Sequence, residues 1–156
     1  MSEGEWFTPL SGREYEFSDG EQEGLGFTLD KILGTGVAGQ VWKVDVSDGT
    51  TGALKIYNKI PEKNEHARIQ FEVEANIKPE GEWFIQSSGS GKVRNRSAIL
   101  FPFVKSSKDL HSFIKDGDPD METRLEISTD LTNSIIKLHN QDILHNDIKS
   151  RNVLYC

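Results

Sequence analysis

Cysteine is almost absent from this sequence, because the only one is Cys156, the last of 156 residues. A single thiol cannot form an internal disulfide, so the chain is not a small secreted domain held together by disulfides. The sequence also lacks an apolar run long enough to span a membrane. Its first residues are acidic and lack the basic and then apolar pattern of an export signal. We therefore expect an intracellular, cytoplasmic protein without a membrane segment.

An excess of positive charge is missing as well. The chain has 18 Lys and Arg against 25 Asp and Glu, a net charge of −7. Eight of the acidic residues fall within residues 1–30, where Arg13 is the only basic one, so this stretch carries the whole excess (1 − 8 = −7). Such a distribution offers no electrostatic footprint for nucleic acid or for an anionic membrane.

Sustained periodicity is lacking at the N-terminal end. Residues 1–25 are acidic, contain several glycines and show neither a helical nor a strand period. This composition predicts a disordered leader. Its aromatic residues, Trp6, Phe7, Tyr15 and Phe17, are candidates for docking on the body of the protein or on a partner.

A glycine-rich motif follows the first predicted strand, residues 27–33. It reads Gly34-Thr35-Gly36-Val37-Ala38-Gly39-Gln40-Val41, a G-x-G-x-x-G-x-V pattern. Trp42, Val44 and Val46 then alternate with polar residues, which predicts a second strand. A hairpin is therefore expected, and not the strand-to-helix turn of a dinucleotide-binding fold. Glycines allow a backbone to lie close to phosphates, although a hairpin without a ligand is the alternative.

A lysine stands in an otherwise apolar third strand, residues 53–57. Lys55 would need a carboxylate partner if it were buried, and the alternative is an exposed lysine on an edge strand. The predicted helix over residues 64–78 supplies Glu72 and Glu74, and it ends at Pro79. The two glutamates lie about 200° apart around a helix, so only one of them can face Lys55.

The middle of the chain predicts two more strands, at residues 83–85 and 97–101, joined by a flexible polar turn over residues 87–92. Asp109 is expected to cap a short helix that continues to Lys115. Asp118-Pro119 is expected to open a longer helix. Its apolar stripe is Ile127, Leu131, Ile135 and Leu138. The histidines have no ligand partners at metal spacing, so no transition-metal site is predicted.

The last motif is a polar loop that follows two apolar residues. It reads His145-Asn146-Asp147-Ile148-Lys149-Ser150-Arg151-Asn152. Phosphoryl transfer needs a group that orients the attacking hydroxyl, a group that holds a metal ion and a positive charge beside the moving phosphoryl group. The aspartate, amide and lysine of this loop are residues of those three kinds.

The order and spacing of these motifs resemble the protein kinase family over about residues 26–156. The resemblance implies an α+β, protein-kinase-like fold: a five-stranded antiparallel N-lobe sheet with one packed helix, and the first helices of an incomplete C-lobe. We expect a disordered leader at residues 1–25, an N-lobe and hinge at 26–104 and a partial C-lobe at 105–156. The lysine two residues after Asp147 implies a serine/threonine-type kinase. Aminoglycoside- and choline-kinase-like phosphotransferases are the alternative, because they carry a similar loop.

The resemblance also implies roles for individual residues, with ATP and Mg²⁺ as the ligands. Lys55, paired with Glu74, would hold the α- and β-phosphates. Asp147 would orient the substrate hydroxyl, Lys149 would steady the γ-phosphate and Asn152 would bind Mg²⁺. The other nucleotide-binding positions implied are Gly34, Gly36, Gly39, Val41, Ala53, Phe101, Pro102 and Val104.

The sequence departs from the family in two places. Asn146 stands where the family usually has arginine, which makes regulation by a phosphorylated activation loop doubtful. The sequence also reaches Cys156 without a D-F-G motif, whose aspartate is the family's main Mg²⁺ ligand. We expect a truncated kinase domain that is inactive alone, a non-catalytic pseudokinase that binds a nucleotide or a partner, or a domain completed by another chain. A protein substrate or partner would then use the uncovered face of the predicted C-lobe helix.

Overall fold

The computed structural model describes residues 8–58 and 64–156. The chain forms two compact units. The first consists of Met1–Lys78 with Ile85–Phe103, and the second of Pro79–Phe84 with Val104–Cys156. Within the described ranges, no helix has both the length and the apolar composition required to cross a membrane.

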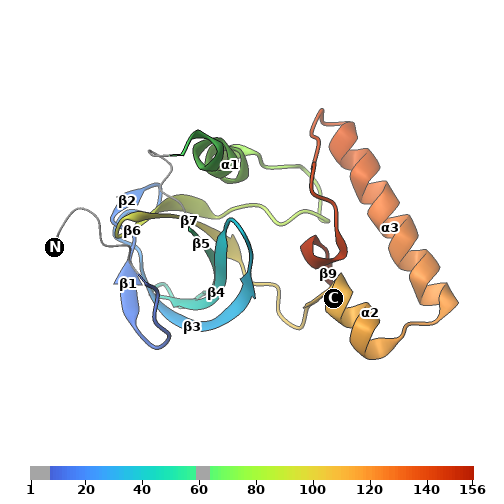
Figure 1. Ribbon diagram of the computed structural model, residues 1–156, viewed down its shortest axis with the longest axis horizontal. Helices are drawn as coiled ribbons and strands as arrows, with labels where there is room; N and C mark the ends of the chain where they lie inside the picture. Colours follow the sequence, from blue (N-terminus) through green and yellow to red (C-terminus); the bar gives the residue numbers. More distant parts are fainter. Residues whose placement is uncertain (1–7, 59–63) are drawn as a thin grey trace. The chain divides into compact units, whose positions relative to one another are not determined.

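An antiparallel sheet dominates the first unit (Figure 1). Its strands follow the order β1-β3-β4-β5-β7-β6-β2, and every neighbouring pair is antiparallel. The strands are β1 (Glu14–Glu16), β2 (Asp19–Gly20), β3 (Gly26–Thr35), β4 (Gly39–Val46), β5 (Thr51–Tyr57), β6 (Gly89–Val93) and β7 (Arg96–Pro102). The sheet curls strongly in Figure 1, as right-handed twist favours in an antiparallel sheet.

Alternation along the strands divides the side chains between two faces. The inner face of the curled sheet carries the larger core. That core contains Phe17, Phe27, Leu29, Trp42, Val44, Val46, Leu54, Ile56, Val93, Ala98 and Leu100. The residues between them in sequence point outward, among them Val41, Ala53, Lys55 and Ile99, and the cross-strand pairs place Lys55 beside both Val41 and Ile99.

The outer face is covered in part by α1 (Glu65–Asn76). Asn64 caps this helix, because its side chain accepts a hydrogen bond from the Ala67 amide at 2.9 Å. Ala67 and Ala75 are buried, and a second core cluster joins α1 to the sheet through Tyr57, Ala75 and Ile99. The helix therefore presents the face that carries Glu74 toward β5.

The structure differs from the predicted disordered leader over residues 8–25, while residues 1–7, with Trp6 and Phe7, lie outside the described part. Residues 14–20 run from β1, at one end of the sheet, to β2, at the other. Phe17 lies between these strands with 1% of its surface exposed. Its amide donates to Leu25 at 3.0 Å and the amide of Ser18 donates to Lys92 at 2.7 Å. An apolar side chain that fills the core thus outweighs the acidic composition around it.

The predicted turn over residues 87–92 is also wrong, because Gly89–Val93 forms strand β6. The reversal lies one step later, where Arg94 has a positive φ of 55°. A Cβ on Gly91 would overlap the carbonyl oxygen of Asp19, and one on Gly20 would come within 2.5 Å of Gly91 Cα. These glycines allow β2 and β6 to approach each other closely. In the sequence alone, the same glycines are typical of a turn.

The second unit is mainly helical. Asp109 caps α2 (Leu110–Gly117) as predicted, since it accepts a hydrogen bond from the Ser112 amide at 3.0 Å. The longer helix, α3 (Met121–His139), begins later than expected. Its cap is Asp120, and Asp118 instead ends α2 with a φ of 40°. Of the apolar stripe predicted on α3, only Leu138 is buried among the described residues.

The predicted strand at residues 83–85 is absent from the described structure. Residues 81–84 form a turn, in which the Phe84 amide donates to the Gly81 carbonyl at 3.3 Å. Gly81 has a φ of 127°, a value that residues other than glycine rarely adopt. This backbone conformation does not continue into an extended strand. Gln141, just after α3, fixes this segment by bonding both the amide and the carbonyl of Glu80, at 2.7 and 3.0 Å.

Candidate active site

The glycine-rich motif forms the β3–β4 hairpin of the first unit. The Gly36 amide donates to Gly39 at 2.9 Å, and the tip residue Val37 is 91% exposed. A Cβ on Gly39 would collide with the Ile56 carbonyl, so the sheet itself requires that glycine. A Cβ on Gly34 or Gly36 would meet no described atom within 4 Å. These two glycines therefore leave open space above the hairpin.

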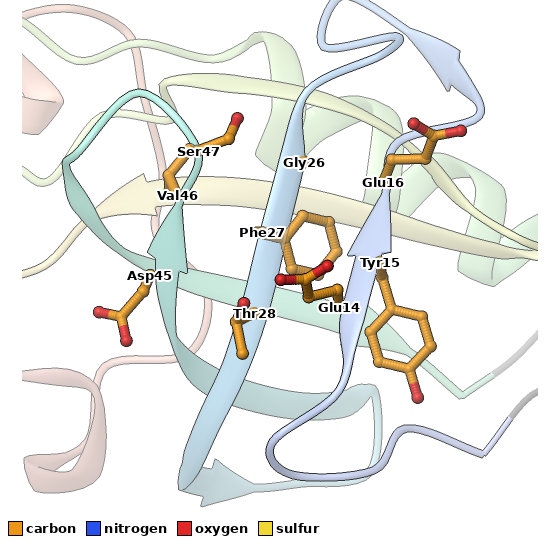
Figure 2. A pocket seen from close by; sticks show the side chains of 9 residues that line it. All are labelled: Glu14, Tyr15, Glu16, Gly26, Phe27, Thr28, Asp45, Val46 and Ser47. Carbon is orange, nitrogen blue, oxygen red and sulfur yellow. The ribbon is translucent and has the colours of Figure 1, made fainter.

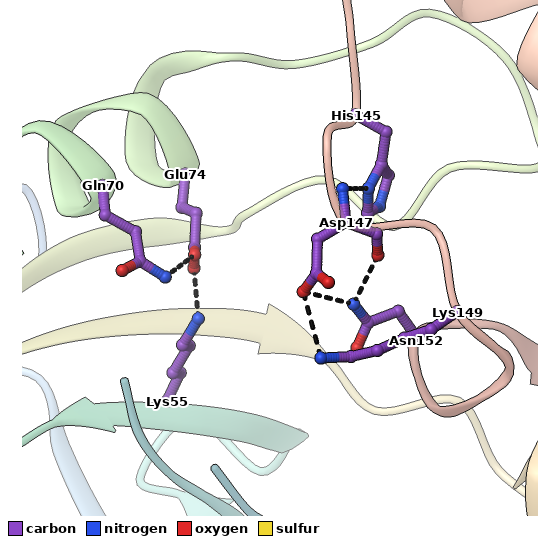
Figure 3. A network of polar contacts seen from close by, with 7 residues as sticks. All are labelled: Lys55, Gln70, Glu74, His145, Asp147, Lys149 and Asn152. Atoms are coloured by element: carbon purple, nitrogen blue, oxygen red, sulfur yellow. Dashed lines mark hydrogen bonds and ion pairs between the residues drawn. The ribbon is translucent and has the colours of Figure 1, made fainter. Parts of the chain in front are cut away.

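Lys55 pairs with the glutamate that the family resemblance favoured (Figure 3). Its Nζ lies 2.5 Å from Glu74 Oε2, and the two side chains are 19% and 29% exposed. Glu72, the competing carboxylate, points elsewhere on α1 and pairs with Arg68 at 2.9 Å. The rotation of about 200° between these two positions of the helix therefore separates a partly buried glutamate from an exposed one.

Two residues that the sequence analysis did not single out also bind this glutamate. The Tyr57 hydroxyl donates to Glu74 Oε2 at 2.5 Å, and the Gln70 side-chain amide donates to Oε1 at 3.0 Å. Burial acts most strongly on Glu74 and would raise its pKa. The charge of Lys55 and the hydrogen bonds from Lys55, Tyr57 and Gln70 outweigh that effect and hold the pKa below its ordinary value. The carboxylate is thus kept ionised.

Sequence signals for both residues exist. Tyr57 is two positions after Lys55 in the same strand, so the two side chains share a face. Gln70 is four positions before Glu74 on α1, where side chains are neighbours.

The residues expected around a nucleotide base fall into both units. Ala53 and Phe101 are cross-strand neighbours in the first unit, next to the pair Val41 and Lys55 along the same face. Pro102 ends β7 on an exposed position. Val104 belongs to the second unit.

The polar loop in the second unit is anchored by a short strand that follows it. Residues Ser150–Asn152 form a 3₁₀ turn, and β9 (Leu154–Tyr155) pairs with β8 (Lys108–Asp109). Tyr155 stacks on Phe113 of α2 with ring centres 3.9 Å apart. These contacts tie the end of the loop to the start of α2.

Asp147 is the centre of the contacts within the loop (Figure 3). Its Oδ2 lies 3.2 Å from Lys149 Nζ and accepts a hydrogen bond from Asn152 Nδ2 at 3.0 Å. The same amide nitrogen donates to the Asp147 carbonyl at 2.9 Å. The hydrogen bond from Lys149 and then that from Asn152 hold the pKa of Asp147 below its ordinary value. The contacts use one carboxylate oxygen and one end of the amide.

The residue that departs from the family has a local backbone explanation. Asn146 has a φ of 60°, in the left-handed region where asparagine is among the best tolerated residues after glycine. His145, before it, is exposed and its Nδ1 accepts a hydrogen bond from the Asp147 amide at 3.2 Å. Both residues shape the turn that presents Asp147.

A groove lies along β1, β3 and β4 of the first unit (Figure 2). It encloses about 540 Å³ and is lined by Glu14, Tyr15, Glu16, Gly26, Phe27, Thr28, Asp45, Val46 and Ser47. Its charged side chains are all acidic and would repel phosphate groups. It contains none of the predicted site residues, so it is not the predicted nucleotide site.

The structure thus collects the predicted residues into two groups, each within one unit. The first unit holds Gly34, Gly36, Gly39, Val41, Ala53, Lys55, Glu74, Phe101 and Pro102, and the second holds Val104, Asp147, Lys149 and Asn152. Within the described residues, no cluster of three or more His, Cys, Asp or Glu side chains is arranged to hold a metal ion.

Comparison with known proteins gives a consistent family. The sequence profile of the protein kinase domain matches residues 27–156. A probable LRR receptor-like serine/threonine-protein kinase of Arabidopsis thaliana is 30% identical over 135 residues, which cover 82% of this chain and 22% of the relative. A probable dual specificity protein kinase of Caenorhabditis elegans, madd-3, is 29% identical and covers 83% of this chain and 15% of the relative. The chain therefore spans about a fifth of these relatives' length or less.

Solved structures show the same fold. A double mutant of the PknI kinase domain of Mycobacterium tuberculosis matches with a TM-score of 0.72 at 20% identity and covers 95% of this chain and 57% of that one. Rad53 in complex with AMP-PNP matches with a TM-score of 0.65 at 23% identity, over 81% of this chain and 33% of that one. These matches confirm the predicted protein-kinase-like fold. The expected number of strands is wrong, because the sheet of the described structure has seven strands in place of five, with β1 and β2 added by residues 14–20.

Proposed function

The chain belongs to the protein kinase domain family, and we propose that it binds ATP as part of a serine/threonine-type kinase domain. The observation that carries the proposal is the partly buried pair of Lys55 and Glu74 beside the glycine-rich hairpin. A buried lysine with a fixed carboxylate is a prepared phosphate-binding charge. The ligand of the Rad53 structure, AMP-PNP, is a nucleotide of the class proposed here.

The hairpin supports this assignment. The sheet requires glycine at Gly39, but no described atom requires it at Gly34 or Gly36. Glycine at those two positions suits a backbone that approaches phosphate oxygens, where a Cβ would hold them away. In this assignment Lys55 bonds the α- and β-phosphates, and Val41, Ala53 and Phe101 contact the base.

The loop of the second unit would supply the groups for transfer. Asp147 uses Oδ2 for Lys149 and Asn152, and in the described structure Oδ1 has no recorded partner, so it can accept the proton of a substrate hydroxyl. Lys149 adds positive charge for the γ-phosphate.

The residues present fit one amide ligand for Mg²⁺. The Asn152 amide nitrogen is used by Asp147, which leaves its Oδ1 as an oxygen ligand. Bound Mg²⁺ supplies charge neutralisation on the phosphates and accepts few protein ligands beside phosphate and water oxygens. We propose that the 156-residue chain alone transfers phosphate negligibly, because an aspartate ligand after Asn152 is not in this sequence.

A non-catalytic nucleotide-binding module is the second candidate. It is favoured by the metal-binding residues predicted from the sequence, because they amount to the single amide of Asn152. In that case the chain binds ATP through Lys55 and nucleotide raises its stability. No phosphate is transferred, even when a separate chain that supplies the rest of a kinase domain is added.

Thermal unfolding of the purified chain tests the shared part of both candidates. Mg-ATP at about a hundred times its dissociation constant is expected to stabilise the native state by roughly 2.7 kcal/mol. Lys55→Ala should abolish the shift, and Lys31→Ala, an exposed lysine on the same sheet, should retain it. A melting temperature that ignores Mg-ATP in all three chains contradicts the proposal. Lys55-dependent transfer of γ-phosphate by the isolated chain would contradict the expected inactivity.

A further inference from the structure

The carboxylate of Glu74 is held at both oxygens, and Lys55 accounts for only one of the three side-chain contacts. Oε2 accepts hydrogen bonds from Lys55 and from the Tyr57 hydroxyl, each at 2.5 Å, and Oε1 accepts one from Gln70 at 3.0 Å. The Lys55 ammonium also lies 4.9 Å from the centre of the Tyr57 ring. Tyr57 thus contacts both members of the ion pair.

Tyr57 is the most deeply buried member of this group. It is 1% exposed, and its ring packs edge-on against Phe71 of α1, with centres 5.5 Å apart at 89°. Its backbone carbonyl accepts a hydrogen bond at 2.7 Å from the side chain of Arg96, which is itself 4% exposed on β7. The tyrosine ring is placed by two side-chain torsions, whereas lysine has a flexible four-carbon stem. Less conformational freedom is therefore lost when the tyrosine is fixed.

We propose that Tyr57 is a positioning residue of the nucleotide site, whose hydroxyl holds Glu74 against Lys55 and so keeps α1 docked on β5 before a nucleotide binds. This inference rests on the proposed binding of phosphate by Lys55. With Lys55 as its only partner, Glu74 would be held by a long and flexible side chain. The buried phenol gives the carboxylate a fixed point, and Gln70, one helical turn away, sets the direction of the other oxygen.

The protonation of Tyr57 suits this task. Burial, followed by the nearby negative charge of Glu74, raises its pKa far above the ordinary value, so the hydroxyl stays a donor throughout the working pH range. A neutral donor adds a hydrogen bond to the carboxylate without competing with Lys55 for the role of counter-charge.

Tyr57→Phe removes the hydroxyl and retains the ring. Two quantities are measured on the full 156-residue chain: the pKa of Glu74, from carbon-13 NMR of its carboxyl group, and the dissociation constant for Mg-ATP. The variant is expected to raise the Glu74 pKa, because a hydrogen bond to the ionised form is lost. It is expected to weaken Mg-ATP binding on the order of threefold to tenfold, the range of one hydrogen bond.

Tyr155→Phe is the matched control. It removes the same hydroxyl from a tyrosine of the second unit whose ring contact with Phe113 is retained, and both quantities should stay at the wild-type value. If Tyr57→Phe does not fold, the hydrogen bond is tested instead by proton NMR of the wild-type protein. The Tyr57 hydroxyl proton should exchange slowly with water and show proton–proton contacts to the Glu74 side chain.

The outcomes separate this inference from the proposed function. A Glu74 pKa that Tyr57→Phe leaves unchanged, or a hydroxyl proton that exchanges freely in the wild type, overturns the role of Tyr57. Mg-ATP binding that needs Lys55 but is equally tight in Tyr57→Phe overturns it as well. A raised Glu74 pKa in a protein that binds no Mg-ATP at all upholds the contact with Glu74 and overturns the nucleotide function.

Discussion

The two units hold their key charges in opposite ways. In the first unit, Lys55 lies on a strand and Glu74 on a helix, and the two residues are 19 positions apart in the sequence. Their side chains are only 19% and 29% exposed. In the second unit, Lys149 and Asp147 are two residues apart and are 55% and 63% exposed. The first pair is part of the tertiary packing, whereas the second is a feature of one loop in contact with water.

This difference follows from where apolar surface is buried. Among the buried apolar side chains of the described structure, only Leu110 and Leu138 lie in the second unit. The first unit has a filled sheet interior and a second cluster beneath α1. A charge pair at the edge of such packing has fixed partners, while a pair on an exposed loop can exchange its partners with solvent or substrate.

Removing a side chain from the sheet interior should give the largest effect. Phe17→Ala is expected to lower the free energy of unfolding by about 3–5 kcal/mol, because it leaves a cavity in the core. Leu125→Ala on α3, where the side chain is 61% exposed, should change it by less than about 0.5 kcal/mol. Urea unfolding followed by tryptophan fluorescence measures both. Equal losses would remove the contrast between the two units.

Breaking the pair of the first unit comes next. Lys55→Met should lower the free energy of unfolding by about 1–3 kcal/mol, since Glu74 is left partly buried without its counter-charge. Adding Glu74→Gln to that variant should recover part of the loss, because the uncompensated charge is gone. The four chains of this double-mutant cycle are compared in urea, and strictly additive losses would show that the pair is not coupled.

Acid should act through Glu74. Its folded pKa is lower than the ordinary value of 4.5, so its contribution to stability is complete above the pKa of the unfolded chain. The contribution disappears as the pH falls through the lower folded pKa. The wild type should therefore lose stability below about pH 4.5 more steeply than Glu74→Gln, which has no such proton to bind. Urea midpoints between pH 7 and pH 3 decide this, and parallel curves would contradict it.

The pair of the second unit should give the smallest effect on stability. Asp147→Asn is expected to leave the melting temperature unchanged within error, because the carboxylate is 63% exposed and contacts only its own loop. The same variant should abolish phosphate transfer once a complete kinase domain is assembled. Differential scanning calorimetry and a transfer assay measure the two effects, and a clear fall in melting temperature would mean that this loop supports the fold.

Local patterns in the sequence were sufficient for much of the fold and of the candidate site. The alternation from Trp42 to Val46, the helix ahead of Pro79 and the cap at Asp109 all depend on neighbouring residues, and the structure has each of them. The choice of Glu74 over Glu72 came from the resemblance of residues 71–75 to the family's helix, and the ion pair agrees with it.

The errors arose where distant segments meet. Acidic residues around Phe17 suggested disorder, and glycines at 89 and 91 suggested a turn. Both segments contribute strands to the sheet, because the Phe17 ring fills the core between β1 and β2 and Gly91 faces the backbone of Asp19. No window of sequence records such contacts, since they join residues far apart in the chain.

The sequence by itself determined the order of the motifs, the residue types of the candidate site and the order of the helices, because these depend on residue identity and local spacing. Only the tertiary structure decided that residues 14–20 connect the two ends of the sheet and that Tyr57 shares an oxygen of Glu74 with Lys55. The physical reason is that burial and hydrogen-bond direction are properties of packed neighbours, and packing assigns those neighbours only when the sheet closes around its core.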